Sequence, residues 1–157
     1  MKYLAFTVIG GFVLVALLCA SVAHPSASAY AVTILITEDE AKLPPPKEPP
    51  PISDRAITRG PKIELSAEDN GTLQAPVHLK LNFKTFGGAT VDLAALQATY
   101  IKDPSIDLTQ RVKPFAQQSG IDIPDAQLPV GQHMLKIDIK DSEGRSGSKI
   151  FVLKIQP

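Results

Sequence analysis

Short runs in which apolar and polar residues alternate fill the chain from Pro61 to its C-terminus. A period of two is typical of β-strands that bury one face, and turn residues separate the runs. The apolar positions of the clearest runs are Ile63, Leu65 and Ala67; Val77, Leu79, Leu81 and Phe83; Leu96, Ala98 and Tyr100; and Leu135, Ile137 and Ile139. Shorter pieces lie at 106–112 and 121–123. We therefore expect an all-β fold with about seven strands, as in a β-sandwich.

Turn residues define the connections between these runs. Asp69-Asn70-Gly71 follows the first run, and Phe86-Gly87-Gly88 ends the second. Asp92 to Ala95 predicts a single helical turn before the third run. Asp141-Ser142-Glu143-Gly144 stands between the run at 135–139 and a final run from Lys149 to Ile155. These last two runs predict a β-hairpin.

The N-terminus has a different pattern, because no charged residue occurs between Tyr3 and Ala20. Lys2 precedes this apolar run, and small residues follow it, as in a secretory signal peptide with cleavage after Ala29 or Ala23. An uncleaved membrane anchor is the alternative.

The only cysteine, Cys19, follows two leucines, whereas a lipidated cysteine follows a small residue. This context argues against a lipoprotein. Residues 1-29 are therefore expected to be a cleaved signal peptide, and the mature chain to be periplasmic or secreted. The membrane is a partner only if the apolar segment is retained as an anchor.

Residues 30-60 combine a short β/helical segment with a proline-rich linker. Tyr30 to Ile36 is a β-prone run, and Thr37-x-x-Glu40 has the spacing of a capping box at the start of a helix. Six of the eight residues from Pro44 to Pro51 are proline, which favours an extended polyproline II stalk. The stalk is either a spacer or a ligand for an aromatic groove. We expect Ile34 to Pro61 to lie outside the independently stable unit.

The segment from Leu128 to Arg145, in which Pro-x-Gly-x-His leads an alternating strand into Asp-x-x-Gly, resembles the penultimate strand of bacterial immunoglobulin-like and fibronectin-III-like domains. Val91 to Tyr100, Ile106 to Thr109 and Phe115 are similar to their middle strands. The resemblance covers residues 61-157. It implies a single immunoglobulin-like antiparallel β-sandwich preceded by a signal peptide and a proline-rich stalk. The same layout occurs in small exported proteins of unassigned function, and the fold itself serves many functions.

Charge and motif content argue against several function classes. The 16 Lys+Arg balance the 16 Asp+Glu, and no basic stripe is present that would bind nucleic acid. His133 is in phase with the apolar residues of its strand and should lie at the end of the core, whereas His78 is out of phase and should face solvent. The chain contains neither a Gly-x-Ser-x-Gly motif nor a glycine-rich loop between a strand and a helix. We expect a protein that is not an enzyme and has no cofactor.

A periplasmic copper-binding β-sandwich protein is the alternative. Cleavage after Ala23 would make His24 the N-terminal residue, whose amine and ring nitrogen can both bind copper. The segment from Asp141 to Phe151 is similar in layout to the end of the copper-resistance β-sandwich family. Arg145, however, stands where that family has a liganding histidine. Asp141 is expected to accept backbone N–H bonds in its turn rather than to bind calcium.

The final strand predicts a surface for a partner. Its larger residues should face the core, which leaves Ile150 and Val152 on the outer face, with Met134 across the hairpin. Apolar residues are unusual on the solvent face of an antiparallel sheet.

Two explanations for this patch remain open. In one, a segment of the same chain covers the patch by folding back; the covering residues would be Val32, Ile34 and Ile36. In the other, the patch docks another protein of the bacterial cell envelope, over its face or by strand addition. The function expected from the sequence is therefore an exported, non-enzymatic immunoglobulin-like module with a binding or structural role.

Overall fold

Alternating burial along the strands builds two sheets that face each other across one apolar core. The computed structural model describes residues 32–48, 59–66 and 72–157. Among them are ten strands and three short helices. The strands are β1 (Thr33–Ile34), β2 (Lys62–Leu65), β3 (Leu73–Gln74), β4 (Val77–Lys84), β5 (Val91–Tyr100), β6 (Ile106–Asp107), β7 (Ala116–Gln117), β8 (Gly120–Gln127), β9 (Gly131–Asp141) and β10 (Ser146–Gln156). The helices are α1 (Glu38–Ala41), α2 (Thr109–Val112) and the 3₁₀ helix η1 (Lys113–Phe115).

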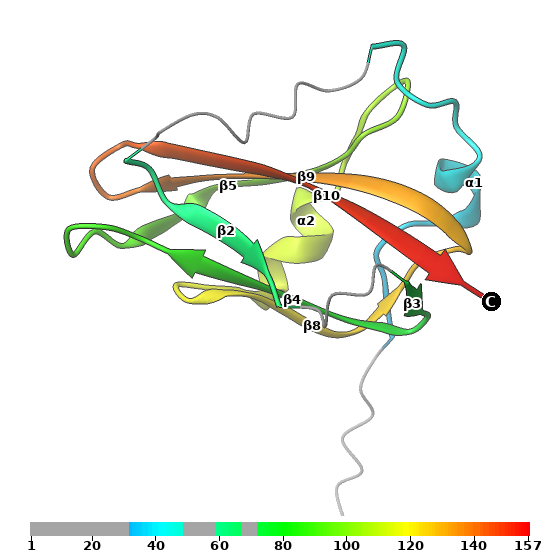
Figure 1. Ribbon diagram of the computed structural model, residues 1–157, viewed down its shortest axis with the longest axis horizontal. Coiled ribbons are helices and arrows are strands. Elements are labelled where there is room, and N and C mark those ends of the chain that lie inside the picture. Colours follow the sequence, from blue (N-terminus) through cyan, green and yellow to red (C-terminus); the bar gives the residue numbers. More distant parts are fainter. Residues whose placement is uncertain (1–31, 49–58, 67–71) are drawn as a thin grey trace, which may run out of the picture.

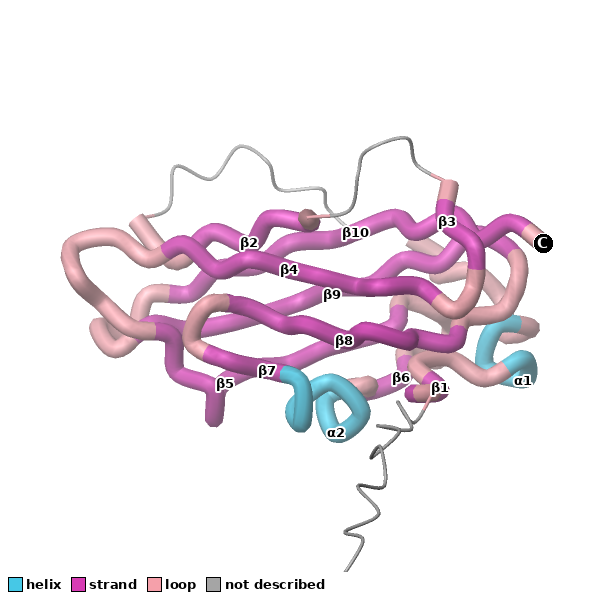
Figure 2. The backbone as a smooth tube through the Cα atoms, turned by 90° about the horizontal axis from the view of Figure 1, so that it is seen from below, coloured by secondary structure: helices cyan, strands magenta, loops and turns pink. Residues whose placement is uncertain are grey.

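The first sheet has the order β1-β8-β4-β2, with β7 also paired to β8, and the second has the order β3-β10-β9-β5-β6. Figure 1 shows the second sheet above the first, and Figure 2 views the molecule from the side of the first sheet. The expected all-β sandwich is therefore confirmed. The expectation of a purely antiparallel sandwich is wrong in detail, because β1 runs parallel to β8 and β3 runs parallel to β10. Both parallel pairings involve only two-residue strands.

Period-two alternation places the core side chains as expected. Every second residue of β4, starting at Val77, is buried, and the residues between them are exposed. Leu96, Ala98 and Tyr100 of β5 are at most 1% exposed. β9 and β10 form the expected hairpin, in which Leu135 lies opposite Phe151. These facing residues fill the space between the sheets, and burial of each large apolar side chain contributes about 1.5–3 kcal/mol.

The helical turn expected at Asp92 to Ala95 is wrong, because these residues belong to the continuous strand β5. Asp92 Oδ1 does accept a local hydrogen bond from the Ala94 amide, at 2.9 Å. The strand pairs with β9 on both sides of this point, however, with Asp92 opposite Lys140 and Gln97 opposite Asp138. β5 advances by five residues while β9 advances by two, so three extra residues form a bulge rather than a helix.

The piece expected at 106–112 consists of β6 and α2, and the piece expected at 121–123 is the centre of the longer strand β8. Val112 of α2 is 3% exposed. Figure 1 shows α2 between the two sheets, and Figure 2 shows it beside β7. The helix therefore closes one open side of the sandwich with apolar side chains.

Residues 32–44, called the N-terminal strap below, pack against the sandwich. Leu35 is fully buried and Ile36 is 1% exposed, and both belong to the core cluster. The sequence placed the segment from Ile34 onward outside the independently stable unit, whereas the structure packs Leu35 and Ile36 of this segment into the core. The sequence does not indicate this packing, because Leu35 and Ile36 precede a proline-rich run and their hydrogen-bond partner, Gln127 of β8, is distant in the chain. The capping box is confirmed: Thr37 caps α1 and exchanges hydrogen bonds with Glu40.

Several expectations concern residues outside the described ranges. These are the apolar N-terminal run with Cys19, the cleavage positions Ala23 and Ala29, His24, most of the second half of the proline run, and the turn at Asp69-Asn70-Gly71. Within the described ranges, no helix has both the length and the apolar character needed to cross a membrane.

Candidate interaction surface

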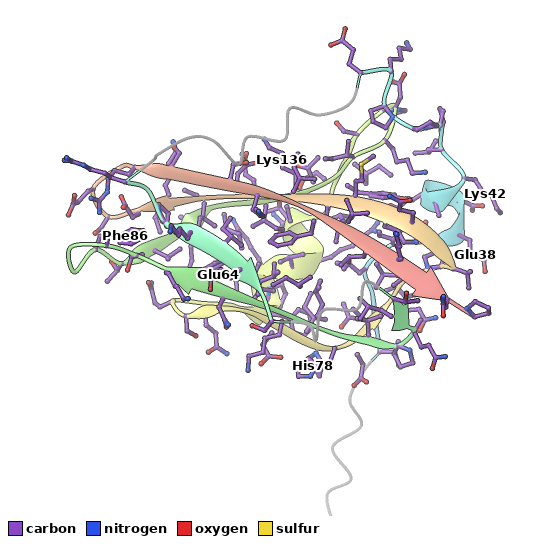
Figure 3. All side chains as sticks on the ribbon, in the orientation of Figure 1. Glu38, Lys42, Glu64, His78, Phe86 and Lys136 are labelled. Carbon is purple, nitrogen blue, oxygen red and sulfur yellow. The ribbon has the colours of Figure 1, made fainter. Side chains whose placement is uncertain are left out.

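The structure brings together the three apolar residues that the sequence placed on the outer face of the hairpin. Val152 lies directly opposite Met134, and Ile150 lies opposite Lys136 on the same face. Val152 is 46% exposed, while Met134 and Ile150 are half-buried. We call these three residues the hairpin patch. Figure 3 shows that Lys136 and His78 point away from the sandwich on opposite faces, so the hairpin patch and His78 belong to different surfaces.

A groove of about 260 Å³ continues the hairpin patch toward the N-terminal strap. Its lining residues are Pro45, Ile101, Lys102, Gln132 and Met134. The Ile101 amide donates to the Met134 carbonyl at 2.9 Å, which fixes Ile101 beside the patch. The groove is smaller than a typical drug-sized pocket of about 300–1,000 Å³. Its size suits a side chain or a peptide edge better than a whole small molecule.

Cationic side chains surround this apolar strip. The Lys102 ammonium donates to the carbonyls of Ala41 and Leu43, at 2.8 and 2.9 Å, and lies 5.5 Å from the centre of the Tyr100 ring. Lys136 pairs with Asp138 at 3.0 Å. The exposed Lys154 follows two positions after Val152 on the same face of β10. The strip is therefore apolar at its centre and has Lys102, Lys154 and the Lys136–Asp138 ion pair at its rim.

The structure does not place Val32, Ile34 and Ile36 over the hairpin patch, as one explanation from the sequence required. Ile36 lies in the core, while Val32 and Ile34 are 54% and 57% exposed beside β8 in the other sheet. The start of the proline run lies here instead: the Asp103 amide donates to the Pro44 carbonyl at 3.1 Å. The parallel pairing of β1 with β8 sends these residues to the opposite sheet.

Sequence reasoning missed Pro45 and Ile101 as members of this surface. For Ile101 a signal was present, because it follows the inward-facing Tyr100 and therefore points outward. For Pro45 no such signal was present, because a proline-rich composition does not indicate which distant residues the run will contact.

His133 lies inside, as its phase in the strand predicts, and is 2% exposed. Its Nε2 lies 2.8 Å from the Pro129 carbonyl, and its Nδ1 lies 2.9 Å from the Tyr100 hydroxyl. A carbonyl only accepts, so Nε2 carries the proton and Nδ1 accepts from Tyr100. Burial lowers the pKa of His133 below 6.5 and raises the pKa of Tyr100. The ring is a structural link between β9, β5 and the preceding loop.

His78 faces solvent, as expected, but it has a partner. Its Nε2 lies 2.6 Å from Asp122 Oδ1 on the neighbouring strand β8. The hydrogen bond from His78, together with Lys80, lowers the pKa of Asp122. This group is an exposed cross-strand ion pair on the first sheet, and such pairs contribute little to stability.

Asp141 performs the expected turn chemistry. Its Oδ1 accepts from the amides of Glu143 and Arg145, at 3.0 and 2.9 Å, and its Oδ2 accepts from Arg145 Nε at 2.7 Å. Burial of the carboxyl acts to raise its pKa, but the bonds and charge of Arg145 lower it overall. Arg145 thus neutralises the carboxylate that would have to face a metal ion. Within the described part of the chain, no three His, Cys, Asp or Glu side chains are grouped as a metal site.

Comparisons of the chain with protein-family models, with curated proteins and with solved structures give no match.

Proposed function

We propose that the chain is an exported, non-enzymatic immunoglobulin-like module that binds another protein of the bacterial cell envelope. The order of its long strands supports the fold type. β2, β4 and β8 are neighbours in one sheet, and β10, β9 and β5 are neighbours in the other. The same arrangement relates strands A, B and E to strands G, F and C of the immunoglobulin fold.

The observation that carries the binding role is the apolar strip on the outer face of the second sheet. It runs from Val152 through Met134 to the groove at Ile101. A sheet face directed at solvent is normally polar, and an apolar patch with a polar rim is typical of an interaction site. The lysines around the strip favour a partner with an apolar centre and acidic surroundings.

Export to the periplasm or the exterior rests on the N-terminal pattern, in which an uncharged run precedes small residues up to Ala29. A binding role rather than catalysis is supported by the way the buried polar groups are used. His133 and Asp141 are both buried and both engaged in hydrogen bonds that hold loops and turns. The ion pair of Arg145 with Asp141 occupies the position at which the copper-resistance family has a liganding histidine, and this argues against the copper alternative.

The test is the double variant Ile150→Lys and Val152→Lys, which places two charges in the hairpin patch. Cross-linking and affinity capture from the native envelope should identify a protein that the parent chain retains and this variant loses. The matched control is Ser146→Lys with Ser148→Lys, because both serines are exposed on the same face of β10 but outside the patch. The control should retain that partner.

Both variants must unfold cooperatively near the parent's temperature, so that the comparison concerns the surface rather than the fold. If the patch variant keeps every partner of the parent, the outer face of the second sheet is not the binding site. If the control loses the same partner as the patch variant, the effect is one of charge alone, and the proposal likewise fails.

A further inference from the structure

Lys102 places a fixed positive charge on the wall of the groove beside the hairpin patch. Its ammonium has three N–H donors, and two bonds tie it to the carbonyls of Ala41 and Leu43, at 2.8 and 2.9 Å. The same ammonium lies 5.5 Å from the centre of the Tyr100 ring. These contacts fix the position of the charge, and they leave the third donor for an acceptor in the groove.

The acidic side chains closest to Lys102 are paired with other cations. Asp103, the next residue, forms an ion pair with Lys47 at 3.3 Å. Glu40 of the strap forms an ion pair with Arg111 at 2.7 Å. Among the described residues, Lys102 itself forms no ion pair with a carboxylate. An ammonium that is held by carbonyls but has no counter-ion favours an anion in the groove beside it.

The remaining lining of the groove favours an aliphatic group next to that anion. Ile101, Met134 and Pro45 form the apolar walls. The exposed Gln132 is the second polar lining residue, and its side-chain amide can donate a hydrogen bond. A ligand that fits this groove therefore combines an aliphatic side chain with an acidic group that meets Lys102.

The apolar strip ends at this groove. The Ile101 amide, just after β5, donates to the carbonyl of Met134 in β9. Beyond Ile101, the Asp103 amide donates to the Pro44 carbonyl, and Pro45 forms a wall of the groove. Figure 1 shows the cyan segment after α1 beside the light green loop that follows β5. A peptide that lies over the strip meets a wall here, which suits the end of a chain better than an uninterrupted segment.

We propose that the groove binds the C-terminal residue of a partner protein, an aliphatic residue whose free carboxylate pairs with Lys102. The aliphatic side chain lies against Ile101 and Met134, and the Gln132 amide donates to the carboxylate. The preceding residues of the partner cover the hairpin patch. Capture of a terminal carboxylate is a recurring mode of peptide recognition. This inference rests on the proposed function, because the groove is the end of the strip proposed there as the binding surface.

The test uses an array of immobilised hexapeptides that end in leucine, isoleucine or valine and differ in their other positions. Each peptide is synthesised twice, once with a free C-terminal carboxylate and once as the C-terminal amide. The purified exported chain is then bound to the array. We expect peptides whose free acids bind about tenfold more tightly than their amides, or more, because the amide lacks the charge that Lys102 meets.

The variant Lys102→Met identifies the cation that recognises the carboxylate. The acid and the amide of each peptide should bind this variant equally. The ratio of the two affinities stays informative even if loss of the bonds to Ala41 and Leu43 weakens binding of both forms.

A second variant covers the case in which Lys102→Met does not fold. Gln132→Glu puts a carboxylate beside that of the ligand, so it should weaken the free acids by about tenfold and leave the amides nearly unchanged. The matched control is Gln97→Glu. Gln97 is exposed and lies opposite Asp138 on the same face of the sheet, outside the groove. This control should keep the parent's ratio of acid to amide affinity.

The outcomes separate this inference from the proposed function. Suppose that the parent binds acids and amides equally, and that Ile150→Lys with Val152→Lys abolishes both. The strip then binds protein without recognising a chain end, and only the inference fails. A preference for acids that persists in Lys102→Met or Gln132→Glu also overturns it, as does an array without binders. The proposed function fails only if the patch variant keeps every envelope partner of the parent.

Discussion

Two hydrogen bonds determine the protonation of the buried His133 ring. Nε2 donates to the Pro129 carbonyl, and Nδ1 accepts from Tyr100. A second proton would have to enter Nδ1, displace the Tyr100 donor and place a charge in the core. The phase of the strand predicts that this ring faces inward. The two partners that fix its tautomer could not be predicted, because alternation indicates direction but not which distant side chain lies there.

This geometry predicts a specific pH dependence of stability. Burial lowers the folded-state pKa of His133 below its ordinary 6.5, so the unfolded chain binds the proton more readily. The stabilisation is complete above the unfolded pKa and decreases as the pH falls below it. We expect the free energy of unfolding to decrease as the pH is lowered from about 7 to about 5. Urea unfolding across this range measures it.

The variant His133→Gln has no titrating ring at this position and should show a shallower profile than the parent over the same range. Glu40, with a pKa lowered to about 2 from 4.5, contributes stability that is lost only as the pH falls below 4.5. The titration of Glu40 therefore does not account for a change in the free energy of unfolding between about pH 5 and pH 7. A slope in His133→Gln equal to that of the parent contradicts the assignment.

At the scale of single elements, local pattern and long-range pairing determine different features. β4, β9 and β10 follow their period-two patterns, since each has one face in the core along its length. The bulge in β5 and the docking of β1 depend on partners that are distant in the chain. The run from Tyr30 to Ile36 indicates a β-strand, but nothing in it indicates that the strand pairs with β8.

Burial of the strap predicts that a substitution at Leu35 lowers the free energy of unfolding substantially. The proline-rich residues that follow would instead suggest that the segment tolerates substitution. Leu35→Ala removes side-chain atoms from a fully buried position, and such cavities cost about 2–5 kcal/mol. Ile34→Ala, next to it but 57% exposed, should change stability by less than about 0.5 kcal/mol. Chemical denaturation of the two variants provides the comparison. Equal stability of both would mean that the strap lies outside the cooperative unit.

The residues just before β2 cross β10 at a point where no side chain fits. A Cβ added to Gly147 would collide with the Pro61 carbonyl, and one added to Gly60 would collide with the Ser146 carbonyl. The two sheets are joined here by direct backbone contact.

Gly147→Ala should therefore separate the two strands and destabilise the protein by about 1–3 kcal/mol, the usual cost of overpacking. Ser148→Ala is the control, because Ser148 is the exposed next residue of the same strand. Thermal unfolding of both variants decides the matter: if Gly147→Ala melts with the control, the close approach of the two backbones is not required for the fold.

At the scale of the whole molecule, the sandwich and its N-terminal strap form one packed unit. The strap supplies core residues from one end of the chain, while β10 at the other end supplies Phe151, Leu153 and Ile155. Removal of an N-terminal signal peptide is compatible with this fold only if cleavage occurs before the strap begins at Val32. Both positions predicted from the sequence, after Ala23 and after Ala29, satisfy this condition.

We therefore expect the exported chain to begin at His24 or at Tyr30 and to carry no lipid. Intact mass spectrometry of the protein purified from a bacterial host that exports it measures both properties. Ala29→Leu puts a bulky side chain where the signal peptidase requires a small one, so it should move cleavage to the position after Ala23 and lengthen the chain by six residues, as counted from the sequence. Diacylglycerol on Cys19 contradicts the prediction. So does a mature chain that starts after Val32, because it would lack part of the strap that contributes Leu35 and Ile36 to the core.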